Sequence, residues 1–398
     1  SAYCSPRFWR GGPSVGRLIV VSNRMNEAMR TFGALALFLI VGLGSRGISA
    51  AECSWPAWDH YKHAMMSADG RIIDRSTEQM ISTSEGQSYS LFFALVANDR
   101  ASFARILEWT RNNLAEGSLD AHLPAWQWGR SASGKWQVLD KNNASDADLW
   151  LAYSLLEAGR LWDVPEYAAQ GNNLLWRSAA QSLRTLPGLG LMLLPGNFGF
   201  EPPEGWRFNP SYLPPAMLAL FAQKASIWAE LAANQQRLLI EGSPKGFAPD
   251  WLLWRTAGGW APDPVENSAG DYDAIRVYLW VGTLAEDAAN RQTLQQHFTP
   301  MVKLTEKLGY PPESVNALTG TYSGHGSVGF SAAMLPLLAS TDSPAFAIQR
   351  ARVHDHPPAE DAYYSRSLML FGLGWTEQRY RFDKNGHLLP AWTRTCQN

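Results

Sequence analysis

From Glu85 towards the C-terminus, apolar residues recur every three or four positions, the spacing that places them on one face of an α-helix. Two such stripes are Phe103, Ile106, Leu107 and Thr110, and Leu149, Ala152, Tyr153 and Leu156. The spacing predicts helices over residues 87–98, 101–114, 147–160, 171–184, 212–222, 225–238, 272–285, 290–307, 330–339 and 361–372. Turn-rich segments separate these stretches. The pattern therefore predicts a chain built mainly of helices.

Strictly alternating patterns are scarce, and only residues 136–140 and 380–390 are predicted to form short strands. No Pro/Ser-rich linker and no change in composition divides the chain. The predicted fold class is therefore all-α, in one large domain of roughly ten to twelve helices. Without a repeat of fixed length, these helices form either a closed array or an irregular bundle. Loops at one end of either arrangement would line a groove.

The N-terminal region resembles a processing signal. Residues 1–24 precede the first methionine, Met25, and are predicted to be non-native or mis-called sequence. Residues 25–51 combine Arg30, an apolar run over residues 34–43 and a small-residue cleavage site, as in a secretory signal peptide. A membrane anchor is the alternative, but a membrane span needs about 20 apolar residues. We therefore expect residues 52–398 to form the mature protein, in the periplasm or secreted.

Charge and cysteine content restrict the partners and the compartment. The net charge of -2 provides neither a basic field for nucleic acid nor a polybasic stripe for membranes. A neutral polymer or a small polar ligand fits this balance better. Cys53 and Cys396 stand at opposite ends of the expected mature chain. They are a possible disulfide in an oxidising compartment, and two unrelated buried thiols are the alternative.

Three separated acidic residues are the candidate catalytic groups. Glu85, Asp146 and Asp273 each lie in a segment rich in Gly, Ser, Tyr or Ala, in a chain with 18 Trp, 13 Tyr and 16 Phe. A glycosidase needs an acid, a base and flat aromatic surfaces for sugar rings. Simpler interpretations exist for each residue. Glu85 follows Ser84 in a possible capping box with Gln87, and Asp146 follows Ser145 at a helix start, where an aspartate serves as a cap.

Asp273 has Arg276 three positions later, on the same face of a helix. A guanidinium favours the ionised carboxylate, which suits a general base, although a surface ion pair is the commoner arrangement. Among the aromatic residues, those in turn-rich segments are the better candidates for sugar binding, namely Trp126, Trp128 and Trp206.

Two other motifs are weak. Residues 324–329 match a dinucleotide-binding pattern by letter but lack the preceding strand, so they are interpreted as a flexible loop. His354, Asp355 and His356 contain metal-binding residue types, but two prolines follow them, and a solvated loop is expected. We predict neither a metal nor an organic cofactor.

The acidic segments, in this order, resemble glycoside hydrolase family 8, and most closely its periplasmic endoglucanases encoded beside bacterial cellulose synthase. The similar segments are Cys53–Trp58, Thr83–Tyr89, Ala144–Asp148, Trp206–Pro215, Tyr272–Tyr278 and Gly329–Pro336. The resemblance implies an (α/α)6 barrel, with six inner and six outer helices and a substrate groove at one end. It also implies an inverting attack on β-1,4-glucan, such as cellulose or cello-oligosaccharides.

The resemblance also assigns roles to residues. Glu85 takes the general-acid position, Asp273 the general-base position, and Asp146 binds and distorts the sugar. Carboxyl groups roughly 6.5–9.5 Å apart are expected for inversion, against about 5–5.5 Å for retention. The substrate-binding positions are Trp126 or Trp128 as a platform, Tyr212 and Arg276 around the attacking water and the base, and Trp206 and Tyr89.

The resemblance leaves rival functions open. Chitosanase, lichenase and reducing-end xylanase activities occur in the same family. A non-catalytic glucan-binding subunit of the cellulose export machinery is a rival of another class, although it would not need all three carboxylates. Functional association with the cellulose synthase complex, in cellulose biosynthesis, is expected from the resemblance.

Overall fold

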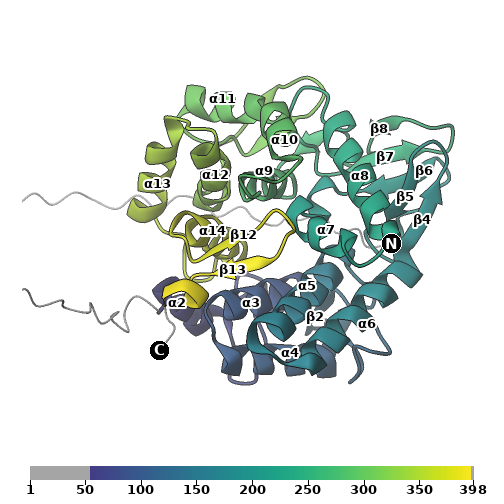
Figure 1. Cartoon of the computed structure of the whole chain (residues 1–398), viewed down its shortest axis with the longest axis vertical. Helices are drawn as coiled ribbons and strands as arrows, with labels where there is room; N and C mark the ends of the chain where they lie inside the picture. The colour runs from purple at the N-terminus through teal and green to yellow at the C-terminus, as the bar shows by residue number, and fades with distance from the viewer. Residues whose placement is uncertain (1–53, 396–398) are drawn as a thin grey trace, which may run out of the picture. The chain divides into compact units, whose positions relative to one another are not determined.

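The structure is a computed structural model that describes residues 54–395 (Figure 1). The predicted upstream segment 1–24, the signal peptide 25–51 and the possible disulfide between Cys53 and Cys396 lie outside the described residues. Across residues 54–395, no helix combines the length and the apolar character that a membrane span requires.

The helices alternate along the chain between an inner ring and an outer ring (Figure 1). The inner helices are α3 (Ser84–Val96), α5 (Ser145–Trp162), α7 (Pro215–Ala222), α9 (Ala274–Gly282), α12 (Val328–Ser340) and α14 (Tyr363–Thr376). The outer positions hold α2 (Pro56–Met65), α4 (Arg100–Leu114), α6 (Pro165–Ser182), α8 (Ser226–Glu241), the pair α10 (Arg291–His297) and α11 (Thr299–Leu308), and α13 (Ala345–Asp355). This arrangement is the expected (α/α)6 barrel.

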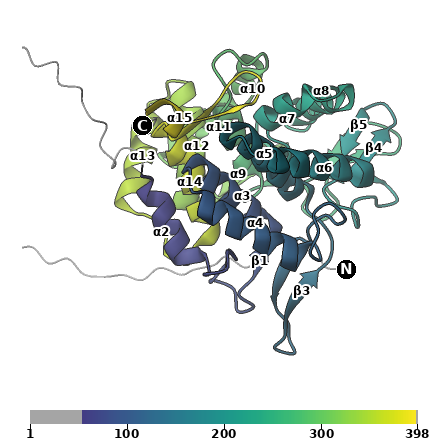
Figure 2. The same ribbon diagram turned by 60° about the horizontal axis from the view of Figure 1, so that its bottom comes forward.

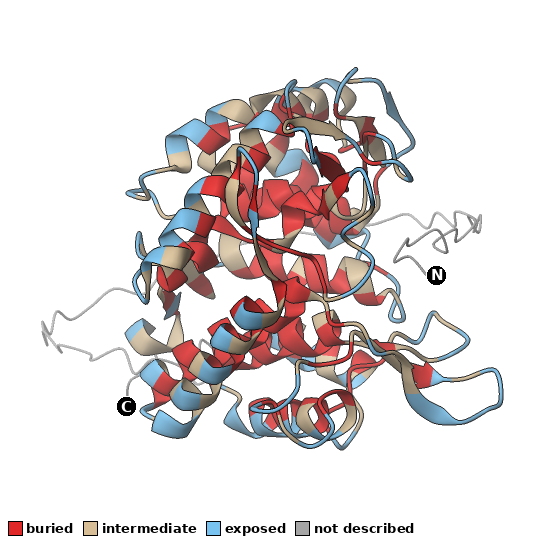
Figure 3. Ribbon diagram, turned by 90° about the vertical axis from the view of Figure 1, so that its right-hand side faces the viewer, coloured by how far each residue is buried: buried red, intermediate tan, exposed pale blue. Residues whose placement is uncertain are grey.

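Burial separates the two rings. Every residue of α9 is buried, and so is every residue of α3 except Glu85. The outer helix α2, in contrast, buries only Trp58, Tyr61 and Met65. Figure 3 shows the same division, with buried segments inside and exposed segments outside. Because inner helices are surrounded on all sides, even their polar residues, such as Gln87 on α3 and Asp148 on α5, are buried.

Aromatic rings fill the centre of the barrel and close the ring of inner helices. Phe371 on α14 lies 4.6 Å from Phe93 on α3, 5.5 Å from Trp150 on α5 and 5.0 Å from Trp280 on α9, between ring centroids. Four inner helices therefore meet at one phenylalanine, which places the last inner helix beside the first. Such pairs add about 0.5–1.5 kcal/mol each beyond their buried area.

Short antiparallel strands decorate the loops. They are β1 (Ser82–Thr83), β2 (Gln127–Arg130), β3 (Trp136–Asp140), β4 (Leu183–Leu186), β5 (Gly190–Leu193), β6 (Gly205–Phe208), β7 (Leu252–Arg255), β8 (Trp260–Pro262), β9 (Ala269–Gly270), β10 (Ser314–Asn316), β11 (Tyr322–Ser323), β12 (Tyr380–Phe382) and β13 (Leu388–Pro390). The sheets are β1-β2-β3, β4-β5, β6-β7-β8, β11-β10-β9 and β12-β13. The hairpin of β2 and β3 projects from the helices (Figure 2). Strands β1 and β9 lead into α3 and α9, so they help to set where those inner helices begin.

Most of the predicted elements are confirmed, and the differences have local causes. Strand 136–140 is β3, and residues 380–390 form the hairpin of β12 and β13. The single helix predicted over 290–307 is wrong, because the chain breaks at Phe298 and restarts as α11 with Pro300 in its first turn. A proline interrupts the backbone hydrogen bonds of a continuous helix but is well tolerated at a helix start.

Candidate active site

Arg276, on the first turn of α9, is the centre of the site. Its guanidinium is buried and donates through Nη1 to Oε2 of Glu85 and through Nη2 to Oδ1 of Asp273, the latter at 2.5 Å. Nη2 also donates to Oγ of Ser211 at 2.9 Å. The two carboxylate oxygens are thus separated by no more than two hydrogen bonds and the width of a guanidinium. Glu85 and Asp273, 188 positions apart in sequence, face the same space.

Glu85 lies in the first turn of α3, and its side chain is 22% exposed. Its second oxygen, Oε1, accepts a hydrogen bond from the Tyr363 hydroxyl at 3.0 Å. The positive end of the helix dipole favours a carboxylate here. Arg276 and Tyr363 therefore fix both oxygens, while the side chain stays partly exposed to solvent.

The capping box predicted for this helix start is wrong. The N-cap is Thr83, whose Oγ1 accepts the N–H of Gly86 at 3.0 Å. Gln87 does not fold back onto the helix start. Its amide donates to Thr110 Oγ1 at 3.0 Å and its Oε1 accepts the N–H of Ile72 at 2.6 Å. Gln87 instead joins α3 to α4 and to the preceding loop, which anchors the turn that carries Glu85.

Asp146 occupies the equivalent place on the next inner helix, α5, and is 4% exposed. Its Oδ1 accepts the N–H of Ala147 at 2.8 Å, and the N-cap is Ala144, so the cap predicted for Asp146 is wrong. Burial raises the pKa of Asp146 to about 7, and the Arg276 cation opposes this rise. The negative charge of Glu85 adds to the rise.

Asp146→Asn is expected to stabilise the protein at alkaline pH. A folded-state pKa near 7 against an ordinary value of 3.8 means that protonation favours the folded state. That stability is present at low pH and is lost as pH rises through about 7. At 1.36 kcal/mol per pH unit, the buried carboxylate costs up to about 4 kcal/mol above that pH. Urea unfolding at about pH 8 should show the variant to be more stable, with no difference near pH 4. A less stable variant at pH 8 would contradict this expectation.

Asp273 precedes α9, with its side chain 19% exposed. The ion pair with Arg276 predicted from the sequence is present, but the guanidinium is buried, so this is not a surface pair. Burial raises the pKa of Asp273 to about 6, although Arg276 opposes this effect and Glu85 reinforces it. The expected preference for the ionised form is thus outweighed by desolvation, which leaves the carboxyl able to exchange a proton at mildly acidic pH.

The aromatic residues named from the sequence lie in different surroundings. Trp126 is partly buried, and its backbone bonds to Ser84 and Asn142, next to the starts of α3 and α5. Trp128 instead stacks on Trp136, with ring centroids 5.4 Å apart, and Arg71 lies over both rings. The position of Trp126 beside the two carboxylate-bearing helix starts makes it the better candidate for a sugar platform.

The other predicted binding residues, Tyr212, Trp206 and Tyr89, differ in burial and in contacts. Tyr212, half-buried at the end of the short 3-10 helix η1 (Pro210–Tyr212), packs edge-on against Trp251. Trp206 lies on β6 and its indole donates to Glu201 at 3.3 Å. Tyr89 is buried, and its hydroxyl accepts a hydrogen bond from Arg276 at 3.3 Å. Tyr89 therefore reaches the site through Arg276.

Sequence reasoning missed several groups. Tyr363 contacts Glu85, Ser211 contacts Arg276, and Asp250 contacts the backbone around Asp273. Ser211 lies within the segment Trp206–Pro215, but nothing in its spacing indicates a bond to Arg276, 65 positions away. No periodicity marks the other two either, because their partners lie on other helices.

The weak motifs stay outside the site. Residues 324–329 form a loop that ends in α12, where Ser327 is the N-cap. His354 and Asp355 belong to the end of α13 rather than to a loop. In the part of the chain that the structure describes, no group of three or more His, Cys, Asp or Glu side chains is placed to hold a metal ion.

Comparisons with known proteins agree on one family. A family model described as glycosyl hydrolases family 8 matches residues 32–378. An endoglucanase of Escherichia coli K12 is 51% identical over 348 residues, which cover 87% of this chain and 94% of that protein. The crystal structure of an endo-1,4-D-glucanase from Vibrio fischeri is 41% identical, with a TM-score of 0.83, covering 86% of this chain and all of that one. An endo-β-1,4-glucanase from Acetobacter xylinum is 26% identical, with a TM-score of 0.66, covering 80% of this chain and 96% of that one.

Proposed function

Because this chain belongs to glycosyl hydrolases family 8, we propose that it is an endo-β-1,4-glucanase that cleaves its substrate with inversion. Relatives that carry the name endoglucanase are 51% identical over most of both chains, which supports this activity. The observation that carries the assignment of residues is the double hydrogen bond from Arg276 to Glu85 and Asp273. It brings two carboxyl groups with different surroundings to one place, as an acid–base pair requires.

In this mechanism Glu85 is the general acid. It protonates the glycosidic oxygen as the bond to the leaving sugar breaks, and the Tyr363 hydroxyl keeps its carboxyl group oriented. Asp273 is the general base, which takes a proton from the water that attacks the opposite face of the sugar ring. A base with a pKa near 6 is largely ionised at neutral pH. Its proton affinity is still high enough to accept a proton in the transition state.

Asp146 and the aromatic residues hold the sugar. Asp146 is buried. A sugar hydroxyl that binds it gives up its hydrogen bond to water and forms one to the carboxyl group. In a medium of low dielectric constant this new hydrogen bond is strong. Such a bond can distort the ring at the cleavage point towards the oxocarbenium-like transition state. Trp126 provides a flat surface for a neighbouring ring, and Tyr212 together with Arg276 borders the water.

The activity is tested by reducing-end release from carboxymethylcellulose, chitosan and xylan. We expect hydrolysis of carboxymethylcellulose, with α-configured reducing ends seen first by proton NMR. Initial β-configured products would contradict inversion. Preferential hydrolysis of chitosan or xylan would assign a sister activity of the family. A folded protein that binds glucan without cleaving it would identify a glucan-binding subunit.

We also propose that the enzyme acts in the periplasm, or outside the cell, in cellulose biosynthesis, in functional association with the cellulose synthase complex. The similarity of its acidic segments to endoglucanases encoded beside cellulose synthase supports this setting. Deleting the gene from a cellulose-producing host should change the amount or crystallinity of exported cellulose. Unchanged cellulose in the deletion strain, with full-length enzyme retained in the cytoplasm, would contradict the proposal.

A further inference from the structure

The start of α9 is capped in an unusual way. An aspartate at an N-cap usually accepts N–H groups of the first turn through its own carboxylate. Asp273 holds the N-cap position of α9 but makes no such bond, and its carboxylate reaches Arg276 instead. Asp250, from the segment before β7, accepts N–H groups at this helix start in its place. Its Oδ1 accepts the N–H groups of Asp271 at 2.8 Å, Asp273 at 3.2 Å and Ala274 at 2.7 Å.

We propose that Asp250 is a positioning residue for the general base: it caps α9 from another segment and so frees the Asp273 carboxylate for the reaction. The proposal rests on the function proposed above, in which Asp273 is that base. Without Asp250, two roles compete for the Asp273 carboxylate: capping its own helix and acting on the substrate. Three hydrogen bonds to one buried oxygen remove this competition and hold the backbone of Asp273 in a single place.

The surrounding chain locks this arrangement. The N–H of Asp250 donates back to the carbonyl of Ala269 at 2.8 Å, so the two segments are joined in both directions. The N–H of Ala248 donates to the Tyr278 hydroxyl at 3.0 Å, which ties the same segment to the body of α9. At Gly270, a Cβ would lie 1.9 Å from the carbonyl oxygen of Ala248. Only glycine allows the turn before Asp273 to approach the Asp250 segment this closely.

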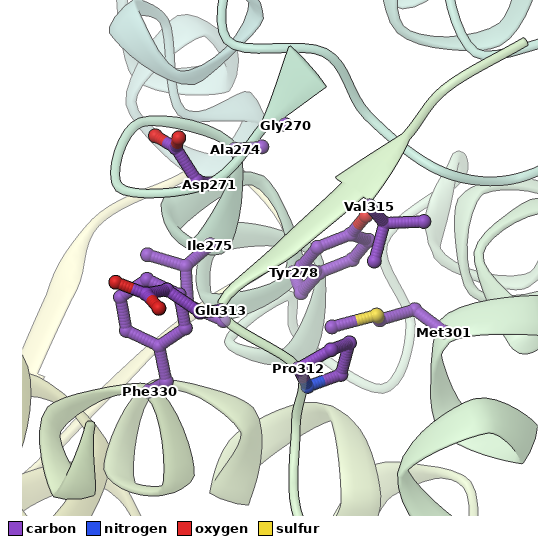
Figure 4. Close-up of a pocket in the computed structure, with 10 residues that line it drawn as sticks. All are labelled: Gly270, Asp271, Ala274, Ile275, Tyr278, Met301, Pro312, Glu313, Val315 and Phe330. Atoms are coloured by element: carbon purple, nitrogen blue, oxygen red, sulfur yellow. The ribbon is translucent and has the colours of Figure 1, made fainter. Parts of the chain in front are cut away.

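The chemistry of Asp250 suits a neutral cap. Asp250 is 7% exposed, and burial together with a hydrogen bond to the Asp271 carboxyl raises its pKa well above the ordinary value. Asp271 is less buried and lines a small hollow with Glu313 (Figure 4). Desolvation therefore favours the protonated form of Asp250. In this form Oδ1 of Asp250 accepts three N–H groups, and its carboxyl proton is available for the hydrogen bond with the Asp271 side chain.

An asparagine would reproduce this pattern, since its Oδ1 accepts and its Nδ2–H donates in the same geometry. We therefore compare Asp250→Asn, Asp250→Ala and Asp250→Glu with the wild type on carboxymethylcellulose. Asp250→Ala should lower kcat about 100-fold with KM changed less than about threefold, because a displaced base affects the chemical step and not binding. Asp250→Asn should keep kcat within about threefold of the wild type. Wild-type kcat in Asp250→Ala, or equal losses in the Asn and Ala variants, would overturn the proposal.

Asp250→Glu keeps a carboxyl group but moves it by one methylene. It should lose at least about tenfold in kcat. A higher kcat in Asp250→Asn than in Asp250→Glu therefore supports the proposal even where Asp250→Ala fails to fold. A Glu variant as active as the wild type, beside an inactive Asn variant, would overturn the geometric argument. The matched control is Asp99→Ala. Asp99 caps α4 through the N–H of Ser102 at 3.0 Å and pairs with Lys62, and its loss should lower Tm but leave kcat unchanged.

A second measurement separates this inference from the proposed function. Hydrogen exchange of the amides in residues 269–276, followed by mass spectrometry, should accelerate in Asp250→Ala and stay slow in Asp250→Asn, whether or not the protein cleaves glucan. An inactive wild type, or a fully active Asp273→Asn variant, would remove the proposed function while this readout still tests the cap. Unchanged exchange in Asp250→Ala would overturn the cap itself.

Discussion

Replacing Glu85 by glutamine is expected to lower the hydrolysis of carboxymethylcellulose by about 10²–10⁴-fold, the usual contribution of a positioned general acid. Glutamine has nearly the same shape: its amide oxygen can accept the hydrogen bond from Arg276, and its amide nitrogen can donate to the Tyr363 hydroxyl. It cannot release a proton. The loss should therefore fall on kcat with little change in thermal unfolding, measured as reducing ends released per minute and as Tm.

The leaving group identifies the acid. A dinitrophenyl cello-oligosaccharide needs no protonation to depart, so Glu85→Gln should cleave it at a rate much closer to that of the wild type. Glu108→Gln is the matched control, since Glu108 is an exposed residue of α4 with one long surface ion pair. Equal losses on both substrates would contradict the acid role. An unchanged rate on carboxymethylcellulose would remove Glu85 from the mechanism.

Asp273→Asn is expected to lose a similar factor of about 10²–10⁴, but on both kinds of substrate, because attack by water is required whatever the leaving group. The wild type should also show an acidic limb in kcat/KM. The pKa of Asp273 is raised to about 6, so the ionised base becomes scarce below that pH and activity should fall about tenfold per pH unit. A pH–rate profile between about pH 4 and pH 8 measures this limb.

The residual activity of Asp273→Asn should lack the limb near pH 6, since the group that produces it is gone. Asp59→Asn on α2 is the control, because Asp59 is exposed and pairs only with its neighbour Lys62 among the described contacts. An Asp273→Asn variant that retains the limb would assign it to Asp146, whose pKa is raised to about 7. A variant that cleaves the dinitrophenyl substrate at the wild-type rate would contradict the base role.

The chain's own pattern predicts the inner helices well, and the reason is local. Helices such as α3 and α9 carry many large apolar residues, and almost all of their positions are buried, so a helical segment is readily recognised there. The outer helix α2 was missed because only Trp58, Tyr61 and Met65 are buried along it. Helix α13 was missed too, since few of its residues face the core. A short helix that buries few residues leaves too weak a periodic pattern in the sequence to be recognised.

By itself, the sequence determined the all-α class, the strands at 136–140 and near 380–390, and the three acidic segments whose contexts resemble a glycosidase family. It also placed Arg276 three positions after Asp273, a relation that any helix there would satisfy. What only the tertiary structure decided is the bond from that same guanidinium to Glu85, the buried state that raises the pKa of Asp146 and Asp273, and the cap from Asp250. Each of these depends on helices distant in sequence packing around one centre. Burial and long-range hydrogen bonds are properties of that packing, and no local pattern encodes them.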